Sequence, residues 1–346
     1  MIASKHNFSK TLVDWQKLHG RHDLAWQIND PYARWISEIM LQQTQVTTVR
    51  EYYDRFMLRF PTVQALAAAD VDEVMQLWAG LGYYTRARNL HKAAQMMVSD
   101  WQGQFKRTRA DWESLPGIGR STAAAIVAFS FAAKETILDG NVKRVLMRYF
   151  GIEASSDDSA VIKELWSLAE SLLPEKDIEA YIQGLMDLGA TVCTRSPSCD
   201  QCPFVADCKA FALGKQREIP WPKKRRERPQ KHAVFCLIWN DDEVFLQKRE
   251  QKGVWQGLFS LPQIDGECSI EECEDTVRAW GFDVRNSRAL PDIVHDFSHY
   301  RLLMHPVAVR VRTKACSIDG QWFDGQARTS IGMPAPVQIL LADFFN

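Results

Sequence analysis

The chain has 346 residues, more than one domain usually contains, so we expect two domains. Its 46% apolar and 25% charged residues are typical of an ordinary globular protein, and its longest nearly apolar stretch, residues 123–133, is too short to cross a bilayer. The net charge of −1 argues against indiscriminate binding to polyanions. We therefore expect no membrane association and a cytoplasmic or nucleoid-associated location in a chain of bacterial type.

The first strong helical signal covers residues 31–49, which begin with Pro31 and carry a broad apolar face. Glu38 lies among these apolar residues, and burial there favours the neutral carboxyl that a general acid needs near neutral pH. The alternative is a Glu38 that points to solvent or pairs with an arginine. Residues 42–45 are all polar, so on a helix some of them, including Gln43 and Thr44, face inward, where amides can probe a base edge.

A loop at residues 80–88 contains two glycines, two tyrosines and two arginines. This composition suits a loop that inserts an aromatic wedge between bases and contacts phosphate. As an isolated pattern it is more often a loop that joins two helices, with its tyrosine packed against the protein. We expect the next helix over residues 86–99.

Residues 115–123 predict a tight helix–hairpin–helix. Pro116 loses a hydrogen-bond donor, and Gly117 and Gly119 allow positive φ, so the helix before them ends there. The second helix, expected over residues 121–131, begins with free N–H groups beside glycines that let another backbone approach, as a phosphate site requires. Asp139 then precedes a helix expected over residues 142–149. It is a good N-cap and, beside a phosphate-binding hairpin, also a carboxylate suited to chemistry on a nucleotide.

Four of the eight cysteines lie within 16 residues, spaced Cys193-x5-Cys199-x2-Cys202-x5-Cys208. Four thiolates this close in a cytosolic protein indicate a metal site rather than disulfides. Zinc and a cubane iron–sulfur cluster both accept four cysteines. Because the spacing differs from the paired CxxC of a zinc ribbon, it favours a cluster.

Residues 212–231 predict an extended linker that contains three prolines, with eight Lys and Arg against two Asp and Glu. Its charge either meets phosphates or solvates the linker. Beyond it the pattern changes, with strands expected at 233–239, 244–248, 300–312 and 321–323, and a helix that starts with a capping box at 269–272 and ends at Gly281. We therefore expect an α+β domain, in which residues 295–300 form a polar–aromatic loop that contacts a ligand.

These motifs together resemble the MutY family of adenine DNA glycosylases over essentially the full length of the chain. The matching stretches are residues 35–46, 80–84, 115–123 and 137–145, the cysteine cluster and the Phe-Ser-His loop at 297–299. The resemblance implies a multidomain protein. An all-α helix–hairpin–helix glycosylase domain at 1–211, with an iron–sulfur cluster loop at 193–208, is followed by the linker at 212–231 and an α+β Nudix-like domain at 232–346 that recognises 8-oxoguanine.

The resemblance also implies an activity. Members of this family act in base excision repair on double-stranded DNA, where they hydrolyse the N-glycosidic bond of adenine mispaired with 8-oxoguanine or guanine after the base is flipped out. We accordingly expect a monofunctional N-glycosylase with at most weak AP lyase activity. We also expect a monomer that carries one [4Fe–4S] cluster.

Site residues follow from the same resemblance. Glu38 is implied to protonate adenine N7, and Asp139 to stabilise the oxocarbenium ion or form a transient adduct with C1′, with support from Asn141. The four cysteines are implied to hold the cluster. The implied DNA contacts are Gln43, Thr44, Leu81, Tyr83, Gly117, Gly119, Ser121, Phe297, Ser298 and His299.

Two other classes of protein share features with this chain, and its cysteine spacing differs in one place from that of the MutY family. An endonuclease III-like lyase shares the helical core and the cluster but carries a lysine nucleophile just after the hairpin, where this chain has Ser121, and Schiff-base chemistry needs an amine. A non-catalytic DNA-binding protein on the same scaffold would be expected to lack Glu38 or Asp139. The departure is a first cysteine gap of five residues, where the family usually has six, so we expect a tightened loop between Cys193 and Cys199.

Overall fold

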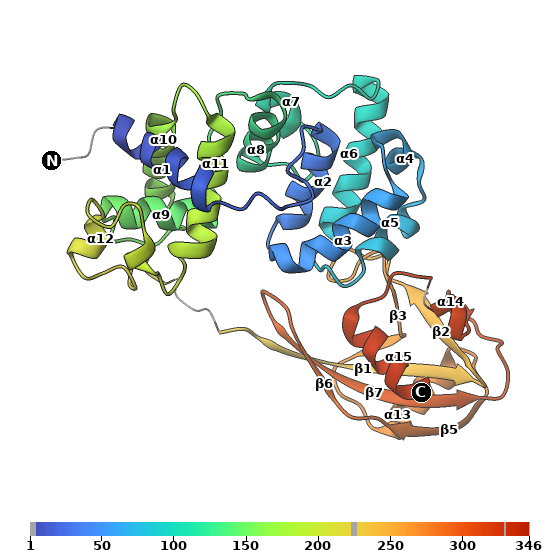
Figure 1. Cartoon of the computed structure of the whole chain (residues 1–346). Helices are drawn as coiled ribbons and strands as arrows, with labels where there is room; N and C mark the ends of the chain where they lie inside the picture. The colour runs from blue at the N-terminus through green and yellow to red at the C-terminus, as the bar shows by residue number, and fades with distance from the viewer. Residues whose placement is uncertain (1–4, 223–226, 329, 346) are drawn as a thin grey trace. The chain divides into compact units, whose positions relative to one another are not determined.

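The computed structural model describes residues 5–222, 227–328 and 330–345 (Figure 1). Its contacts divide the chain into two compact units, one of residues 1–67 and 92–225 and the other of residues 68–91 and 226–346. Within the described ranges, no helix combines the length and the apolar character needed to span a membrane. The basic run Lys223–Arg226 of the expected linker lies outside the described residues.

The first unit is built from helices and the segments that connect them. Its helices are α1 (Lys5–His19), α2 (Pro31–Leu41), α3 (Val46–Arg59), α4 (Val63–Ala68), α7 (Arg109–Glu113), α8 (Arg120–Phe131), α9 (Gly140–Phe150), α10 (Ser159–Leu172), α11 (Ile178–Asp187) and α12 (Lys209–Ala212). A π-helical turn at Leu188–Val192 continues α11, and a 3-10 turn covers Cys199–Gln201. Helix α6 (Thr85–Trp101) passes from the second unit into the first.

The expectation of one helix over residues 31–49 is wrong. Helix α2 ends at Leu41 and α3 begins at Val46, with Gln43 between them at a φ of 59°. The side-chain amide of Gln42 donates to the Gly117 carbonyl and to the Thr122 hydroxyl, both at 3.3 Å. Contacts with the hairpin therefore override the helical propensity of this polar stretch, and its side chains lie on an irregular segment.

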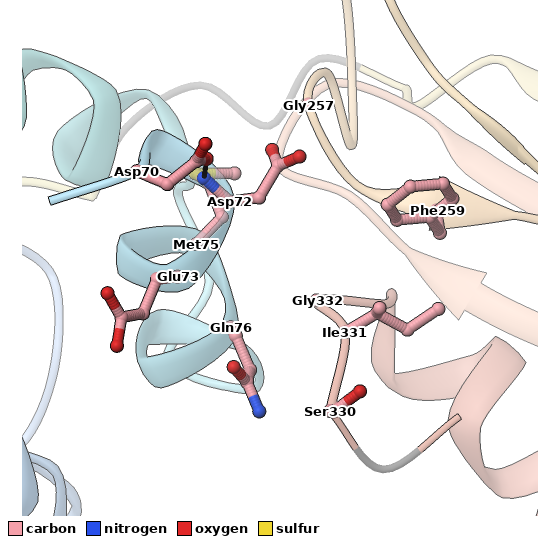
Figure 2. Close-up of a pocket in the computed structure, with 10 residues that line it drawn as sticks. All are labelled: Asp70, Asp72, Glu73, Met75, Gln76, Gly257, Phe259, Ser330, Ile331 and Gly332. Carbon is pink, nitrogen blue, oxygen red and sulfur yellow. Dashed lines mark hydrogen bonds between the residues drawn. The ribbon is translucent and has the colours of Figure 1, made fainter. Parts of the chain in front are cut away.

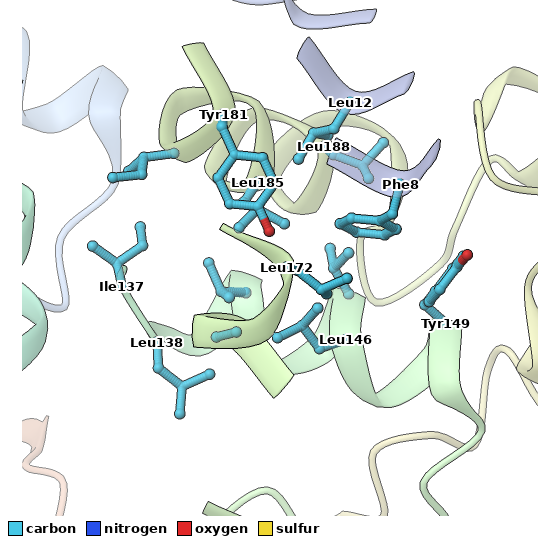
Figure 3. Packing of buried hydrophobic residues seen from close by; sticks show 14 of the residues in the cluster. Phe8, Leu12, Ile137, Leu138, Leu146, Tyr149, Leu172, Tyr181, Leu185 and Leu188 are labelled. Carbon is cyan, nitrogen blue, oxygen red and sulfur yellow. The ribbon is translucent and has the colours of Figure 1, made fainter. Parts of the chain in front are cut away.

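A hydrophobic core fixes the helices around Asp139. Phe8 and Leu12 from α1 pack in one cluster with Leu146, Leu172 and Leu185 from α9, α10 and α11 (Figure 3). Each such side chain, fully buried, contributes about 1.5–3 kcal/mol. Packing of α9 against these helices thus helps to hold its N-terminal end in place.

The second unit contains an eight-stranded mixed sheet in the order β3-β2-β1-β7-β5, with β4 also paired to β1, β6 to β7 and β8 to β2. The strands are β1 (Gln230–Asn240), β2 (Glu243–Lys248), β3 (Phe259–Ser260), β4 (Gln263–Asp265), β5 (Val284–Ala289), β6 (Ile293–Asp296), β7 (Arg301–Val311) and β8 (Gln321–Phe323). Only the pair of β1 and β7 is parallel among these named strands of the described chain. The helices of this unit are α5 (Val71–Trp78), the start of α6, α13 (Ile270–Ala279), α14 (Gly325–Arg328) and α15 (Ala335–Phe345).

Apolar side chains of β1 point alternately to the two faces of the sheet, and a helix packs against each face. Val234 packs with Val309 of β7 and with Cys273 of α13 in one apolar cluster. On the other face, Trp239 meets Phe344 of α15 with ring centroids 5.4 Å apart. Because successive side chains of a strand point to opposite faces, one strand supplies both layers.

Most expected elements of the second unit are present. The hairpin after β1 pairs Trp239 with Val244, and Ser269 and Glu272 form both halves of the capping box. The expected loop over residues 295–300 is shorter than predicted, because His295 and Asp296 belong to β6. Strand β6 pairs with β7 up to Asp296 and Arg301, whose side chains also form an ion pair at 2.7 Å, so residues 297–300 form the tip of a β-hairpin.

Candidate active site

A cavity of about 930 Å³ in the first unit collects six of the predicted site residues. Glu38 enters from α2, and Asp139 and Asn141 enter from the start of α9. The other three that line it are Gln43, Thr44 and Ser121. Segments far apart in sequence therefore present two carboxyls and several polar side chains to one space.

Glu38 is held in a state that favours protonation. Burial raises the pKa of its carboxyl to about 7, with the Arg34 charge opposing the rise and the Asp139 charge adding to it. Arg34 itself is buried at 3% exposure and pairs with Glu179 at 3.0 Å. Near neutral pH a large fraction of Glu38 is thus the neutral acid, which is what proton donation requires.

Asp139 is the N-cap of α9. Its Oδ1 accepts from the Val142 amide at 2.7 Å, and its Oδ2 accepts from the Asn141 side chain at 3.4 Å. Burial raises the pKa of Asp139, whereas the amides of Val142 and Asn141 and the charge of Arg144 oppose the rise. These donors favour the anion at Asp139, while the Asp139 charge favours the neutral form of Glu38.

An arginine connects this carboxylate to the cysteine loop. Arg144 donates from Nη2 to the Oδ1 of Asn141 at 2.8 Å and to the Gly189 carbonyl at 2.7 Å. Its Nε donates to the Cys193 carbonyl at 2.8 Å. The position of Asn141 beside Asp139 therefore depends on the backbone at the start of the cysteine loop.

Sequence reasoning missed the arginines of the cavity. Four of them line it, Arg21, Arg34, Arg144 and Arg195. Arg34 is paired with Glu179 and Arg21 with Asp187, whereas Arg144 donates to Asn141 and to backbone carbonyls. The charge of Arg144 therefore favours an approaching phosphate. The only signal in the sequence was spacing, because Arg34 lies four residues before Glu38 and Arg144 three residues after Asn141, so each pair shares a helix face.

The hairpin lies next to the cavity. Gly117 has a φ of 79°, which favours glycine, and its carbonyl accepts from Gln42. Gly119 is the N-cap of α8, and a Cβ built on it would meet nothing within 4 Å. Ser121 accepts from the Leu138 amide at 3.0 Å, so this side chain holds the segment that leads to Asp139. Neither glycine lines the cavity.

The four cysteines of the loop line one small cavity, together with Arg148, Val192 and Phe211. Burial raises the pKa of Cys202 to about 11 and also raises the pKa of Cys199 and Cys208, while backbone amides aimed at Cys202 and Cys208 oppose this. Arg148 also donates to the Cys193 sulfur at 3.4 Å. Converging thiols that need a cation to ionise, with N–H donors aimed at the sulfurs, fit an iron–sulfur cluster.

A second cavity, of about 490 Å³, lies in the second unit and collects Tyr83 with Phe297, Ser298 and His299. Tyr83 has a φ of 49° and is 48% exposed. The Phe297 ring stands 5.2 Å from the ring of Trp255, which also lines this cavity. Leu81, which is also predicted to contact DNA, is buried at 5% exposure and lines neither cavity.

A third cavity in the second unit, of about 310 Å³, lies beside the start of α5 (Figure 2). Three carboxylates line it, those of Asp70, Asp72 and Glu73. Asp70 caps the helix by accepting from the Asp72 amide at 2.7 Å, and Lys248 pairs with Asp72 at 2.6 Å. An acidic lining of this kind repels phosphate, so we assign this cavity no part in binding DNA.

Two protein-family models match the chain. The first, described as HhH-GPD superfamily base excision DNA repair protein, matches residues 36–171, and the second, described as NUDIX domain, matches residues 233–343. A relative from Buchnera aphidicola subsp. Acyrthosiphon pisum (strain APS), named adenine DNA glycosylase, is 35% identical over 347 residues. The alignment covers 99% of this chain and 98% of that relative.

The chain belongs to the adenine DNA glycosylase family. A human adenine DNA glycosylase is 32% identical over 364 residues, covering 87% of this chain and 66% of the human protein. Membership confirms the expected fold class, a helical helix–hairpin–helix glycosylase part followed by a Nudix-like domain, and the expected class of enzyme, a DNA glycosylase of base excision repair. The mispair and the roles of individual residues stay predictions.

Solved structures agree for the helical part of this adenine DNA glycosylase family member. A thermostable thymine-DNA glycosylase is similar with a TM-score of 0.55 and 30% identity, over 60% of this chain and 97% of that one. A non-covalent complex of endonuclease III with DNA is similar with a TM-score of 0.52 and 24% identity, over 61% of this chain and 98% of that one, which supports the fold alone.

Proposed function

We propose that this protein excises adenine mispaired with 8-oxoguanine or guanine in double-stranded DNA. The observation that carries the proposal is the pair Glu38 and Asp139, two carboxyls that share one cavity. Burial raises the pKa of both, but hydrogen bonds from Val142 and Asn141 oppose the rise at Asp139, whereas the Asp139 charge adds to the rise at Glu38. Hydrolysis of a glycosidic bond needs one carboxyl as an acid and another as an anion. Membership in the adenine DNA glycosylase family supports adenine as the nucleobase that is removed.

Glu38 acts as the general acid. With a pKa of about 7, a large fraction of Glu38 is protonated at neutral pH and can deliver its proton to N7 of a flipped-out adenine. Protonation turns the base into a neutral leaving group, and the electron pair of the breaking N-glycosidic bond goes to the adenine. The deoxyribose is left as an oxocarbenium ion.

Asp139 acts on that cation. Its carboxylate, fixed by the Val142 amide and by Asn141, stabilises the positive charge or forms a transient ester with C1′. Water then attacks C1′ and leaves an abasic site. Since Ser121 stands where a lyase has its lysine, strand cleavage by Schiff-base chemistry is at most weak.

The surroundings of the cavity suit DNA. The free N–H groups at the start of α8, beside Gly117 and Gly119, bind a phosphate, and the charge of Arg144 attracts the backbone around the flipped nucleotide. Gln43 and Thr44 contact the bases. In the second unit, Ser298 and His299 at the tip of the β6–β7 hairpin recognise 8-oxoguanine, with Phe297 packed behind them and Tyr83 beside them.

Cys193, Cys199, Cys202 and Cys208 hold a [4Fe–4S] cluster in this proposal. The cluster supplies electrostatic and structural support to its loop. The protein's own residues do the rest, because Arg144 and Arg148 hold the backbone of Cys193 and its neighbours against α9. The proposed active unit is a monomer on duplex DNA.

Single-turnover excision tests the proposal. The duplexes carry adenine opposite 8-oxoguanine, guanine or thymine, and a further duplex carries thymine glycol, each with and without borohydride trapping. We expect adenine release opposite 8-oxoguanine and guanine without a trapped adduct. Trapped cleavage of thymine glycol would instead move the protein to the lyases. Tight binding without release would identify a non-catalytic sensor.

A further inference from the structure

Two histidines and a glutamate of the second unit converge on one point, and the proposed function uses none of them. His232 lies on β1, His305 on β7, and Glu267 between β4 and α13. One ligand atom from each lies within 4.8 Å of the others. The histidines are half-buried and the glutamate is exposed, so the point is anchored in the sheet and reachable from solvent.

The sheet register brings the two histidines together. Strands β1 and β7 are parallel neighbours, in which Val234 pairs with His305. His232 is two residues before the core residue Val234, and His305 is two residues before Val307, so both lie on the core face just past the end of the core. Their rings are nearly parallel, with an interplanar angle of 14° and centroids 5.4 Å apart.

The atoms that face one another are all lone-pair donors. Nδ1 of His232 lies 3.1 Å from Nε2 of His305, and a carboxylate oxygen of Glu267 contacts the same Nδ1. Without a cation, a single N–H at Nδ1 of His232 would have to donate both to Nε2 of His305 and to the carboxylate of Glu267. Tetrahedral zinc with bonds of about 2.0–2.2 Å to nitrogen and oxygen places its ligand atoms about 3.3 Å apart, close to the observed spacing of the nitrogens.

The outer nitrogens of both rings also have partners. Nδ1 of His305 lies 2.9 Å from a carboxylate oxygen of Asp292, and Nε2 of His232 lies 3.2 Å from the side-chain amide of Gln230. A histidine that binds a metal usually donates its second N–H to a carboxylate or a carbonyl, which fixes the tautomer and turns the ligating nitrogen to the metal. His305 with Asp292 has this arrangement.

We propose that His232, His305 and Glu267 bind a divalent transition-metal ion, and that zinc is the ion the site takes. Two imidazoles and one carboxylate are a zinc donor set with one position left for water, whereas calcium and magnesium prefer oxygen alone. The ion would join β1, β7 and the segment before α13. Asp292, which orients His305, directly precedes β6, so the ion also fixes the base of the hairpin whose tip carries residues 297–299.

Zinc binding to the full, cluster-loaded protein tests this. Cluster-loaded protein is used because its loop cysteines are occupied by iron and cannot compete for zinc. The affinity for zinc is measured by competition with a chromophoric chelator. The variants are H232Q, H305Q and E267Q, with H19Q as a control that removes an exposed histidine outside the site. We expect one zinc per chain, at least about tenfold weaker binding in each of the three variants, and unchanged binding in H19Q.

Two further measurements complete the test. Cobalt bound at this site should show no thiolate-to-metal charge-transfer band, and zinc should slow hydrogen exchange in residues 293–304 of wild-type protein but not of E267Q. Binding of zinc with equal affinity by wild type and E267Q, whose exposed side chain can be changed without disturbing the fold, would overturn the proposal. A charge-transfer band would overturn it as well, since it would place the ion on cysteine.

Discussion

Arg144 donates a hydrogen bond from Nη2 to the Oδ1 of Asn141 at 2.8 Å. Since Asn141 in turn donates to Asp139, and Arg144 also holds the Cys193 carbonyl, loss of this arginine should disturb both the carboxylate and the cysteine loop. We expect Arg144→Gln to lower the single-turnover excision rate by about 10–100-fold, as loss of an outer supporting contact does. Iron content should fall, while the affinity for undamaged duplex should change little.

A matched control separates this effect from the loss of any positive charge. Arg109 pairs with Glu113 and with Glu135 outside the cavity, so Arg109→Gln should keep both the rate and the iron content. Arg144→Gln protein with a normal rate and full iron would show that the chain of hydrogen bonds has no part in the reaction.

Glu38 sets the expected pH dependence of excision. The protonated form of Glu38 is the active one, and its pKa is about 7, so the rate should fall about tenfold per pH unit above pH 8. The rate should also fall at acid pH once Asp139, whose pKa is raised by burial, becomes protonated. Glu38→Gln should abolish most of the excision rate and also the fall in rate at alkaline pH (the alkaline limb). Glu51→Gln, on the exposed surface of α3, should keep both the rate and the alkaline limb. An unchanged alkaline limb in Glu38→Gln would assign the titration to another group.

The same carboxyl makes a separate prediction for stability. The pKa of Glu38 is raised in the folded state from 4.5 to about 7. The protonated carboxyl therefore stabilises the folded protein fully below about pH 4.5, and this stabilisation is lost as the pH rises through 7. At 1.36 kcal/mol per unit the loss reaches about 3 kcal/mol. Glu38→Gln cannot ionise, so its melting temperature should exceed that of wild type at pH 8 and match it at pH 5. Equal melting temperatures of wild type and Glu38→Gln at pH 8 would show that ionisation of Glu38 does not destabilise the folded protein.

Asp139 serves as both helix cap and catalytic anion, and Asp139→Asn separates the two roles. Asparagine caps a helix about as well as aspartate, so the fold should survive. Loss of the negative charge should lower the excision rate by about 10³-fold while mispaired duplex still binds. Asp158→Asn changes the equivalent cap of α10, which accepts from the Ala160 amide at 2.8 Å, and should leave the rate unchanged. Excision by Asp139→Asn at the wild-type rate would refute the mechanism.

Local chemistry made much of this protein predictable. Pro116, the hairpin glycines, the N-cap at Asp139 and the capping box at Ser269 are short-range signals, and the structure has each of them where the sequence places it. The break after Leu41 was not predictable, because it depends on Gln42 reaching a hairpin that lies 75 residues away along the chain. The network of Arg144 depends in the same way on a distant segment, because this arginine also donates to the carbonyls of Gly189 and Cys193.

Gly119 offers a test of phosphate binding that does not disturb the free protein. A Cβ at this position would meet nothing within 4 Å, and the φ of −97° suits alanine. Gly119→Ala should therefore change the melting temperature little, since alanine restricts the unfolded chain but is a weaker N-cap than glycine. An approaching phosphate would meet the new methyl group, so the affinity for duplex DNA should fall about tenfold, or about 1.4 kcal/mol. Unchanged affinity would show that no backbone comes close to Gly119.

The hairpin tip in the second unit predicts how the protein tells 8-oxoguanine from guanine. Ser298 and His299 are exposed beside the cavity, whereas Phe297 packs against Trp255 and supports the turn. Replacing both exposed residues by alanine should thus leave the melting temperature unchanged. Each lost hydrogen bond to the lesion costs about 0.5–1.5 kcal/mol, so the preference for adenine opposite 8-oxoguanine over adenine opposite guanine should fall about tenfold.

The guanine-containing duplex is the internal control for that experiment, because it lacks the oxidised position that the tip is proposed to read. Its excision rate should stay within about twofold of wild type, since the chemistry belongs to Glu38 and Asp139 in the other unit. An equal loss on both duplexes would mean that the tip binds DNA without distinguishing the lesion. An unchanged ratio would remove Ser298 and His299 from recognition and leave Tyr83, which lines the same cavity, as the next residue to replace.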